Sequence, residues 1–189
     1  MTDQDVISDA HRMTGVGTVN AYTPRNRAHK PSWYWTVNAH SHTAWLVAEL
    51  APLLGHRRRS AAIGLWSAGG HPADTFPARR ELTPAEGIPW VAGIVEGEGC
   101  ISVSARGDVS LGVNSTDLDT IVRLHAATGI GRVYERPSRN EKWRPTATWN
   151  VCRINELREL LLELRPWLKS RRRVAIDRAL ICLASKRGR

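Results

Sequence analysis

The sequence predicts an α+β fold of tandem αββαββα repeats with antiparallel strands, in which the first repeat lacks its opening helix and first hairpin. Two observations support this prediction. Residues 3–65 align without a gap on residues 117–179, at an offset of 114, and 22 of the 63 positions are identical. A helical pattern that ends in two acids, over residues 88–99, precedes only the second copy.

The predicted division of the chain follows from this repeat. It comprises a partial first repeat (1–65), a linker rich in glycine and proline (66–87), and a complete second repeat with a basic C-terminal helix (88–189).

The helix before the second copy contains the stretch VAGIVEGEG. Pro89 suits its first position, Gly93 and Gly97 lie four residues apart on one face, and Gly99 suits its end. Glu98 then lies at the C-terminal end, where the helix dipole disfavours a carboxylate unless a cation compensates. A hard divalent metal ion with oxygen ligands would supply that charge.

The elements that follow are predicted from alternation and helical spacing. In order they are strands over 101–106 and 109–114 around a turn at 107–108, a helix over 117–128, strands over 132–136 and 146–153, a helix over 156–168 capped by Asn155, and a basic helix over 171–184. In the last strand Trp149 belongs to the core face, and Thr148 and Asn150 belong to a face free for a ligand. The first copy repeats this pattern with Thr36 and Asn38.

Charge indicates a polyanion as the partner. The 189 residues carry a formal net charge of +9 and a pI near 10.3, which favours nucleic acid. No secretory signal or transmembrane stretch is visible, so a soluble cytoplasmic protein with no membrane partner is expected. Cys100, Cys152 and Cys182 lie far apart and indicate neither a zinc site nor a disulfide framework.

The stretch VAGIVEGEG, with Trp90 before it, resembles the LAGLIDADG motif of homing endonucleases in its WxAGxxEGEG form. The resemblance covers the second repeat entirely and, through the internal match, the first repeat in part, and it implies the fold of that family, in which the antiparallel sheet forms a saddle. It implies a metal-dependent endonuclease that hydrolyses phosphodiester bonds at a long DNA target and is associated with intron or intein mobility. In that family two motif helices pack side by side, from two subunits or two repeats. By resemblance the helix interface consists of Ala92, Gly93, Glu96 and Gly97, and a homodimer through the motif helix is an expected partner.

The resemblance also implies the catalytic residues. Glu98, with Gly97 beside it, would bind Mg²⁺ or another divalent cation. The family's basic residue, usually lysine, corresponds to Arg171 in PWLKSR and to Arg57 in PLLGHR. This is a departure, because arginine stabilises phosphate charge but does not act readily as a base. A polar residue that opens the second helix corresponds to Asn114.

Double-stranded DNA is the expected partner, with polar strand residues on base edges and Arg or Lys on phosphates. The candidates from the second repeat are Ser102, Ser104, Arg106, Arg132, Tyr134, Arg136, Arg139, Lys142, Arg144, Thr148, Asn150 and Arg153, and those from the first are Arg25, Lys30, Thr36 and Asn38.

Two alternatives stay open. The favoured interpretation is an active endonuclease, and the first alternative is a catalytically degenerate DNA-binding relative, a regulator or remnant, which the missing first motif helix and the arginine in place of lysine favour. Charge alone also permits an RNA maturase. The repeat offset places the counterpart of Trp90 before Met1, so we expect a second motif-like segment encoded in frame about 20 codons upstream.

Overall fold

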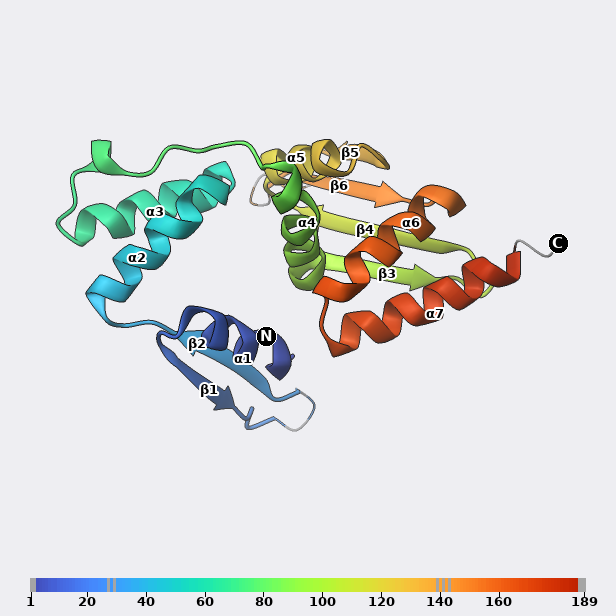
Figure 1. The fold of residues 1–189 in the computed structure, drawn as a ribbon, viewed down its shortest axis with the longest axis horizontal. Helices are drawn as coiled ribbons and strands as arrows, with labels where there is room; N and C mark the ends of the chain where they lie inside the picture. The colour runs from blue at the N-terminus through green and yellow to red at the C-terminus, as the bar shows by residue number, and fades with distance from the viewer. Residues whose placement is uncertain are drawn as a thin grey trace. The chain divides into compact units, whose positions relative to one another are not determined.

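The computed structural model describes residues 3–26, 28, 30–138, 140, 142 and 144–186 (Figure 1). The chain divides into two compact units, Met1–Arg80 and Glu81–Arg189, called unit 1 and unit 2 below. Each unit contains one copy of the sequence repeat. No described helix combines the length and the apolar composition that a membrane span requires.

Unit 2 has the element order predicted from the sequence. It consists of α4 (Pro84–Glu98), β3 (Gly99–Val103), β4 (Val109–Ser115), α5 (Leu118–Thr128), β5 (Arg132–Arg136), β6 (Thr146–Val151), α6 (Ile154–Leu164), the 3-10 turn η3 (Arg165–Trp167) and α7 (Ser170–Lys186). The αββαββα series and its C-terminal helix are therefore confirmed.

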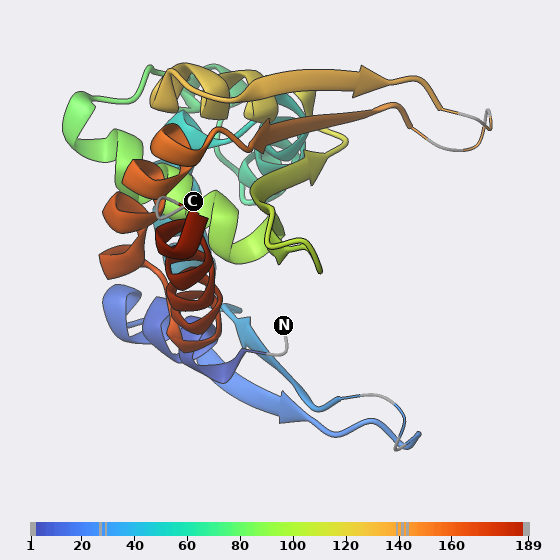
Figure 2. The ribbon, with the colours of Figure 1, turned by 90° about the vertical axis from the view of Figure 1, so that its right-hand side faces the viewer.

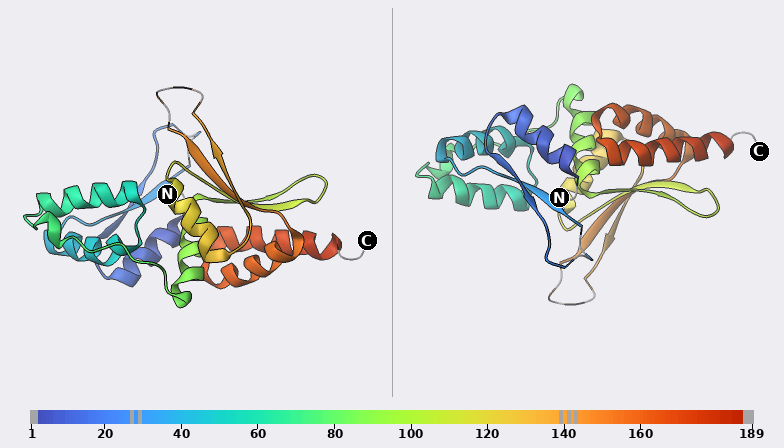
Figure 3. Two further views of the ribbon diagram at one scale, coloured as in Figure 1. Left: turned by 90° about the horizontal axis from the view of Figure 1, so that it is seen from above. Right: turned by 90° about the horizontal axis from the view of Figure 1, so that it is seen from below.

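The sheet of unit 2 separates a core face from a polar face. Its four strands are antiparallel in the order β3-β4-β6-β5. Alternate residues of β4 and β6 are buried on one face, and helices of the unit contact these strands (Figure 3). Figure 3 shows α6 and α7 together on one side of the sheet. The buried residues are Val109, Leu111, Val113, Ala147, Trp149 and Val151. Because side chains alternate along a strand, their neighbours are left on the opposite face for a ligand.

Helix α4 begins earlier than predicted. Its first residue is Pro84, not Pro89, and Thr83 and Glu86 form a capping box in which the Thr83 N–H donates to the Glu86 carboxylate at 2.9 Å. Pro84 at the first position loses no helical hydrogen bond, because that N–H has no intrahelical partner. Pro89 therefore lies inside the helix, where its missing N–H costs one helical hydrogen bond. The capping box and the five helical residues before Pro89 stabilise the helix by more than this loss.

Gly99 ends α4, as predicted, but by a different geometry. Its φ and ψ of −75° and 150° are extended, so the chain passes directly from α4 into β3. A Cβ at Gly99 would lie 2.5 Å from the Val95 carbonyl oxygen and 2.8 Å from the Val95 Cα. Glycine is therefore required for this close approach and not for a left-handed turn.

Helix α6 is shorter than predicted. It begins at Ile154 after Arg153, so the predicted cap Asn155 is its second residue, and it ends at Leu164. The predicted helix over 156–168 is broken because Pro166 lacks an N–H and its ring clashes with a preceding carbonyl. The chain forms η3 instead and enters α7 one residue before the predicted start.

Unit 1 contains the counterparts of the later elements only. They are α1 (Gln4–Thr14), β1 (Thr18–Tyr22), β2 (Ser32–Thr36), α2 (His40–Leu50), η1 (Ala51–Leu53), α3 (His56–Ala68) and η2 (Ala73–Thr75). Among its described residues, unit 1 has no counterpart of α4, β3 and β4. Its buried core consists of Ala51, Ala62 and Phe76.

Part of the predicted linker over 66–87 is ordered structure. Helix α3 extends to Ala68, and the chain returns onto it through η2. The Trp66 indole N–H donates to the Pro72 carbonyl at 3.2 Å, and its ring meets the edge of Phe76. An aromatic contact of this kind, which buries Phe76, is the reason that the segment folds.

The internal repeat is also a structural repeat. The second glycine of each Gly-x-Gly turn, Gly17 and Gly131, has φ near +82° and would place a Cβ within 2.7 Å of a tryptophan Nε1. That indole N–H donates to the residue before the glycine, from Trp35 to Val16 and from Trp149 to Ile130. We call this arrangement, α1–β1–β2 in unit 1 and α5–β5–β6 in unit 2, the repeat module. Figure 2 shows its strands as long hairpins.

A surface ion pair predicts a dependence of stability on pH. The Arg165 guanidinium donates to both oxygens of Asp177, at 2.7 and 3.1 Å, and joins η3 to α7. The hydrogen bond from Arg165 lowers the pKa of Asp177 from its ordinary value of 3.8. A carboxyl with a lowered folded pKa stabilises the fold above its unfolded pKa and loses this contribution as the pH falls through the folded pKa. Urea unfolding of wild type and Asp177→Asn should therefore differ at neutral pH and converge as the pH falls through the lowered pKa of Asp177.

Candidate metal and nucleic-acid site

Glu98 is the last residue of α4, and its side chain is exposed. A carboxylate beside the carbonyl groups of a last helical turn is unfavourable unless a cation neutralises both. Carboxylate oxygen is a ligand that Mg²⁺ and Ca²⁺ prefer. Among the described residues, no group of three or more His, Cys, Asp or Glu side chains is placed to hold a metal ion. A cation at Glu98 would therefore complete its coordination with water and phosphate oxygens, as Mg²⁺ usually does with a nucleic-acid substrate.

The small residues of α4 separate onto two faces. Gly93 and Gly97 are exposed, and a Cβ at either would meet no atom within 4 Å. Ala92 and Glu96, which were predicted at the same interface, are only 3% and 8% exposed. Successive helical residues are rotated by about 100°, so Ala92 and Glu96 face the core of unit 2. Of the predicted interface, only Gly93 and Gly97 are exposed, and a helix contact through them stays a prediction.

Glu96 ties the end of α4 to the start of α7. Its Oε2 accepts a hydrogen bond from the Lys169 backbone N–H at 2.8 Å, and its Oε1 lies 4.0 Å from Arg172 Nε. The Arg172 guanidinium also donates to the Glu96 carbonyl at 3.3 Å. A carboxylate at the positive end of a helix is favoured by the dipole. The two acids of the motif thus have different places: Glu96 faces inward to α7, and Glu98 is exposed.

Arg171 stands in the first turn of α7 and is exposed. Because Arg172 contacts the last turn of α4, Arg171 and Glu98 belong to two helix ends that lie in contact. A guanidinium at this place can bind phosphate as a bidentate donor. Lys169 and Arg172, which the sequence did not single out, form the contact. The only feature of the sequence that indicates these two residues is the basic run at the start of α7, to which both belong.

Glu96→Ala should destabilise unit 2 by about 3 kcal/mol, because the Lys169 N–H loses its acceptor and the nearly buried Arg172 loses its carboxylate. Glu96→Gln keeps an acceptor and should cost less. Glu98→Gln is the matched control and should change stability by less than about 1 kcal/mol, because its side chain is exposed. Urea unfolding measures all three variants, and equal stability of Glu96→Ala and Glu98→Gln would contradict this role for Glu96.

Asn114 lies in strand β4, in agreement with the predicted strand over 109–114, and not at the start of the second helix, where the resemblance placed it. The strand continues to Ser115, and α5 begins at Leu118. On the polar face the Thr148 hydroxyl of β6 donates to the Asn114 side-chain oxygen, and Tyr134 of β5 is the register partner of Thr148. Gly99 of β3 pairs with Val113 of β4 in an antiparallel register. Glu98, which precedes Gly99, is therefore the residue opposite Asn114, which follows Val113. The polar row of Asn114, Thr148 and Tyr134 therefore starts beside Glu98.

The other predicted DNA contacts of unit 2 have exposed or half-exposed side chains. They are Ser102, Ser104, Arg106, Arg132, Arg136, Lys142, Arg144, Asn150 and Arg153. Arg139 lies outside the described residues. The Ser104 hydroxyl is engaged in the β3–β4 turn, where it accepts from the backbone N–H groups of Arg106 and Asp108. Ser104 thus shapes the turn that presents Arg106.

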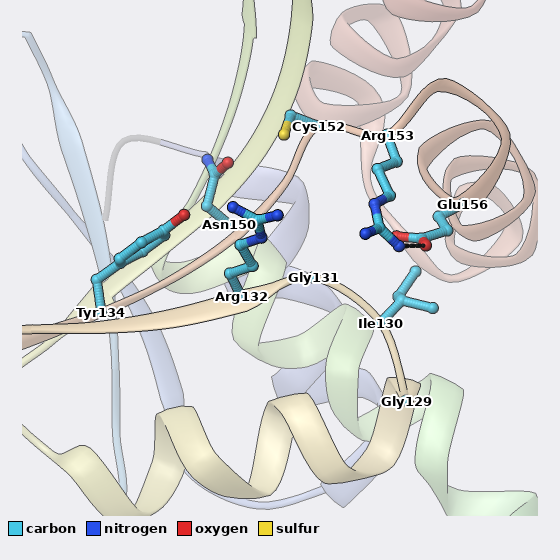
Figure 4. A pocket seen from close by; sticks show the side chains of 9 residues that line it. All are labelled: Gly129, Ile130, Gly131, Arg132, Tyr134, Asn150, Cys152, Arg153 and Glu156. Atoms are coloured by element: carbon cyan, nitrogen blue, oxygen red, sulfur yellow. Dashed lines mark hydrogen bonds and ion pairs between the residues drawn. The ribbon is translucent and has the colours of Figure 1, made fainter.

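A hollow of about 230 Å³ lies on this side of the sheet (Figure 4). Arg132 and Tyr134 of β5 and Asn150 of β6 turn their side chains toward it. The Arg153 guanidinium at its margin donates to Glu156 at 2.9 Å, and this bond raises the pKa of Arg153. Gly129, Ile130, Gly131, Cys152 and Glu156 also line the hollow and were not predicted. Two cations and an amide at one hollow suit a phosphate and an adjacent base edge.

The candidates of the first repeat belong to unit 1. Arg25 and Lys30 are exposed in the β1–β2 connection, Thr36 is half-buried as the last residue of β2, and Asn38 is exposed two residues beyond it. Arg57 is exposed in the first turn of α3, the place that Arg171 has in α7. Each unit therefore presents a basic helix start and a polar strand end at equivalent positions.

Neither a protein-family model nor a curated protein matches the chain. Solved structures do match it. The meganuclease I-SmaMI, bound to uncleaveable DNA, is 11% identical with a TM-score of 0.57, over 99% of this chain and 76% of its own. The LAGLIDADG meganuclease I-AabMI, bound to uncleaved DNA, is 12% identical with a TM-score of 0.53, over 99% and 79%. The LAGLIDADG homing endonuclease I-LtrWI, bound to target DNA, is 14% identical with a TM-score of 0.52, over 98% and 77%. The chain has the fold of the LAGLIDADG homing endonucleases.

Proposed function

We propose that the chain is a DNA-binding, metal-dependent endonuclease of the homing type, which hydrolyses phosphodiester bonds at a long DNA target. The observation that carries the proposal is the exposed Glu98 at the end of α4, in line with the polar row of the sheet and next to the start of α7. A carboxylate without this setting would be an ordinary surface acid.

Glu98 would hold a divalent cation, which when bound supplies neutralisation of the scissile phosphate and a water of lowered pKa. Arg171 binds phosphate charge and stays protonated, so it orients and stabilises but does not accept a proton. The polar row from Asn114 to Tyr134 contacts base edges, and the arginines at the hollow contact phosphates.

The comparison supports duplex DNA as the substrate. The I-SmaMI, I-AabMI and I-LtrWI structures contain DNA. Because the present chain shares their fold and has a formal net charge of +9, we propose that it also binds duplex DNA.

DNA affinity should fall steeply with salt. Each phosphate neutralised contributes a slope of about −0.9 in log affinity against log salt concentration, so six contacts would weaken binding about 10³-fold between 50 and 200 mM. Fluorescence anisotropy with a mixed-sequence duplex measures the slope. Arg132→Gln should reduce it by about 1, whereas Arg178→Gln, on the exposed surface of α7, should not. An affinity that does not change with salt would exclude this mode of binding.

A second candidate is a degenerate relative that binds DNA without cutting it. The arginines at 57 and 171, in place of the lysine of the family, favour this candidate. It predicts the same salt dependence with no product in any divalent cation. Competition between duplex DNA and structured RNA of equal length distinguishes the endonuclease and the degenerate relative from a maturase. The first two should prefer the DNA, and a maturase should prefer the RNA.

A further inference from the structure

The repeat module has the same internal contacts in both units but different burial. In unit 2, Ile121 and Trp149 are completely buried. Their counterparts in unit 1, Ile7 and Trp35, are only half-buried, and the same holds for Val37, the counterpart of the buried Val151. None of the described residues of α1, β1 and β2 is buried. The apolar face of the module in unit 1 is therefore only partly covered, and we call it the open face.

In unit 2 the segment α4–β3–β4 covers this face. Strand β4 pairs with β6 along the edge that β5 leaves open, from Leu111 with Val151 to Ser115 with Ala147. Helix α4 contacts both α5 and α6, and β3 and β4 contact α7. Within the described part of unit 1, β2 pairs with β1 alone, so its outer edge has no strand. In unit 2 the segment α4–β3–β4 also joins the repeat module to α6 and α7. The counterparts of these two helices in unit 1 are α2 and α3, which contact each other around Ala51 and Ala62.

We infer that the open face of the repeat module in unit 1, formed by α1 and the outer edge of β2, is a docking surface for a helix–hairpin segment supplied from outside residues 1–189. The occupant adds an antiparallel strand to β2 and lays an apolar helix face over Ile7 and Trp35. Exposed strand edges bind extended segments in this way, with the backbone giving affinity and alternate side chains giving specificity.

The repeat defines the chemistry of this occupant. In unit 2 the covering strand presents Val109, Leu111 and Val113, and the covering helix presents Val91 and Val95. A second copy of the chain cannot supply its own α4–β3–β4 without exposing its own core, in which these residues are buried. The docking surface does not include Glu98, so its test is separate from the test of the proposed cleavage.

The test uses the full chain and a probe of residues 81–115 fused to a soluble carrier. Hydrogen exchange with the probe should slow exchange of the β2 amides at least about tenfold, while β3 to β6 are unaffected. Val19→Lys and Asn20→Lys are a matched pair on β1, because Val19 pairs with Trp35 and Asn20 is exposed beside Tyr34. Val19→Lys should weaken binding of the probe by at least about tenfold, and Asn20→Lys should leave it unchanged.

Val19→Ala keeps the test decisive if Val19→Lys unfolds unit 1, because removal of two methyl groups should also weaken binding measurably. A probe with Leu111→Lys should not bind. Three results would overturn the inference: no binding of the wild-type probe, protection confined to unit 2, or self-association of the chain that protects β2 without any probe.

Discussion

Glu98→Gln is expected to abolish DNA cleavage and leave DNA binding intact. The substitution keeps the size of the side chain but removes the charge that a divalent cation requires. Loss of several kcal/mol of transition-state stabilisation corresponds to at least about 10³-fold in rate. Binding depends instead on the arginines and on the polar sheet face, and Glu98 is an exposed carboxylate that carries no positive charge for a phosphate.

A pool of supercoiled plasmids with randomised inserts provides the substrate. Wild-type chain with Mg²⁺ should convert a subset to nicked or linear DNA with breaks at one recurring sequence. Glu159→Gln is the matched control, because it makes the same change at an exposed position of α6. Breaks that persist unchanged in Glu98→Gln would show that the catalytic carboxylate is elsewhere.

Double-strand cleavage is expected to depend on self-association. One Glu98 per chain provides a cation for one phosphate, whereas two strands need two metal-activated waters. The monomer should therefore nick one strand at most, and linear product should rise with about the second power of protein concentration below the dimer dissociation constant. Gly93 and Gly97 offer the contact, since both are exposed with open space around them.

Gly93→Leu should suppress linear product at least about tenfold and leave nicking in place, because a leucine prevents close helix contact. Gly64→Leu is the control, since Gly64 is also an exposed helical glycine with no atom within 4 Å of an added Cβ. Sedimentation velocity at the concentrations used relates product to oligomer. Efficient linear product from a demonstrated monomer would contradict this requirement.

The place of Glu98 could be predicted because it depends on local signals. A helix that ends at a glycine is visible in the sequence, and the repeat fixed the order of the later elements. The start of α4 was also visible, since the pattern TPAE, Thr83 to Glu86, is a capping box. The prediction placed it at Pro89 because Pro84 was assigned to the linker over 66–87.

The role of Glu96 could not be predicted in the same way. Its partner is the backbone N–H of Lys169, 73 residues later, and only the packing of α7 on unit 2 brings them together. Helical periodicity gives the angle between residues 96 and 97 but not which face another helix covers. The end of α6 was visible in the sequence at Pro166, and the predicted strand over 109–114 already contained Asn114, so only the helix position that the resemblance implied for Asn114 was wrong.

The most direct test of the account is whether Glu98 binds the metal ion. Electron paramagnetic resonance of free Mn²⁺ can be followed in titrations of wild type, Glu98→Gln and Glu159→Gln, each with the same duplex DNA. The DNA alone binds some Mn²⁺, and this background should be equal in all three titrations. Above it, wild type and Glu159→Gln should each bind one Mn²⁺ ion, and Glu98→Gln should bind none. Equal Mn²⁺ binding by Glu98→Gln and wild type would contradict it.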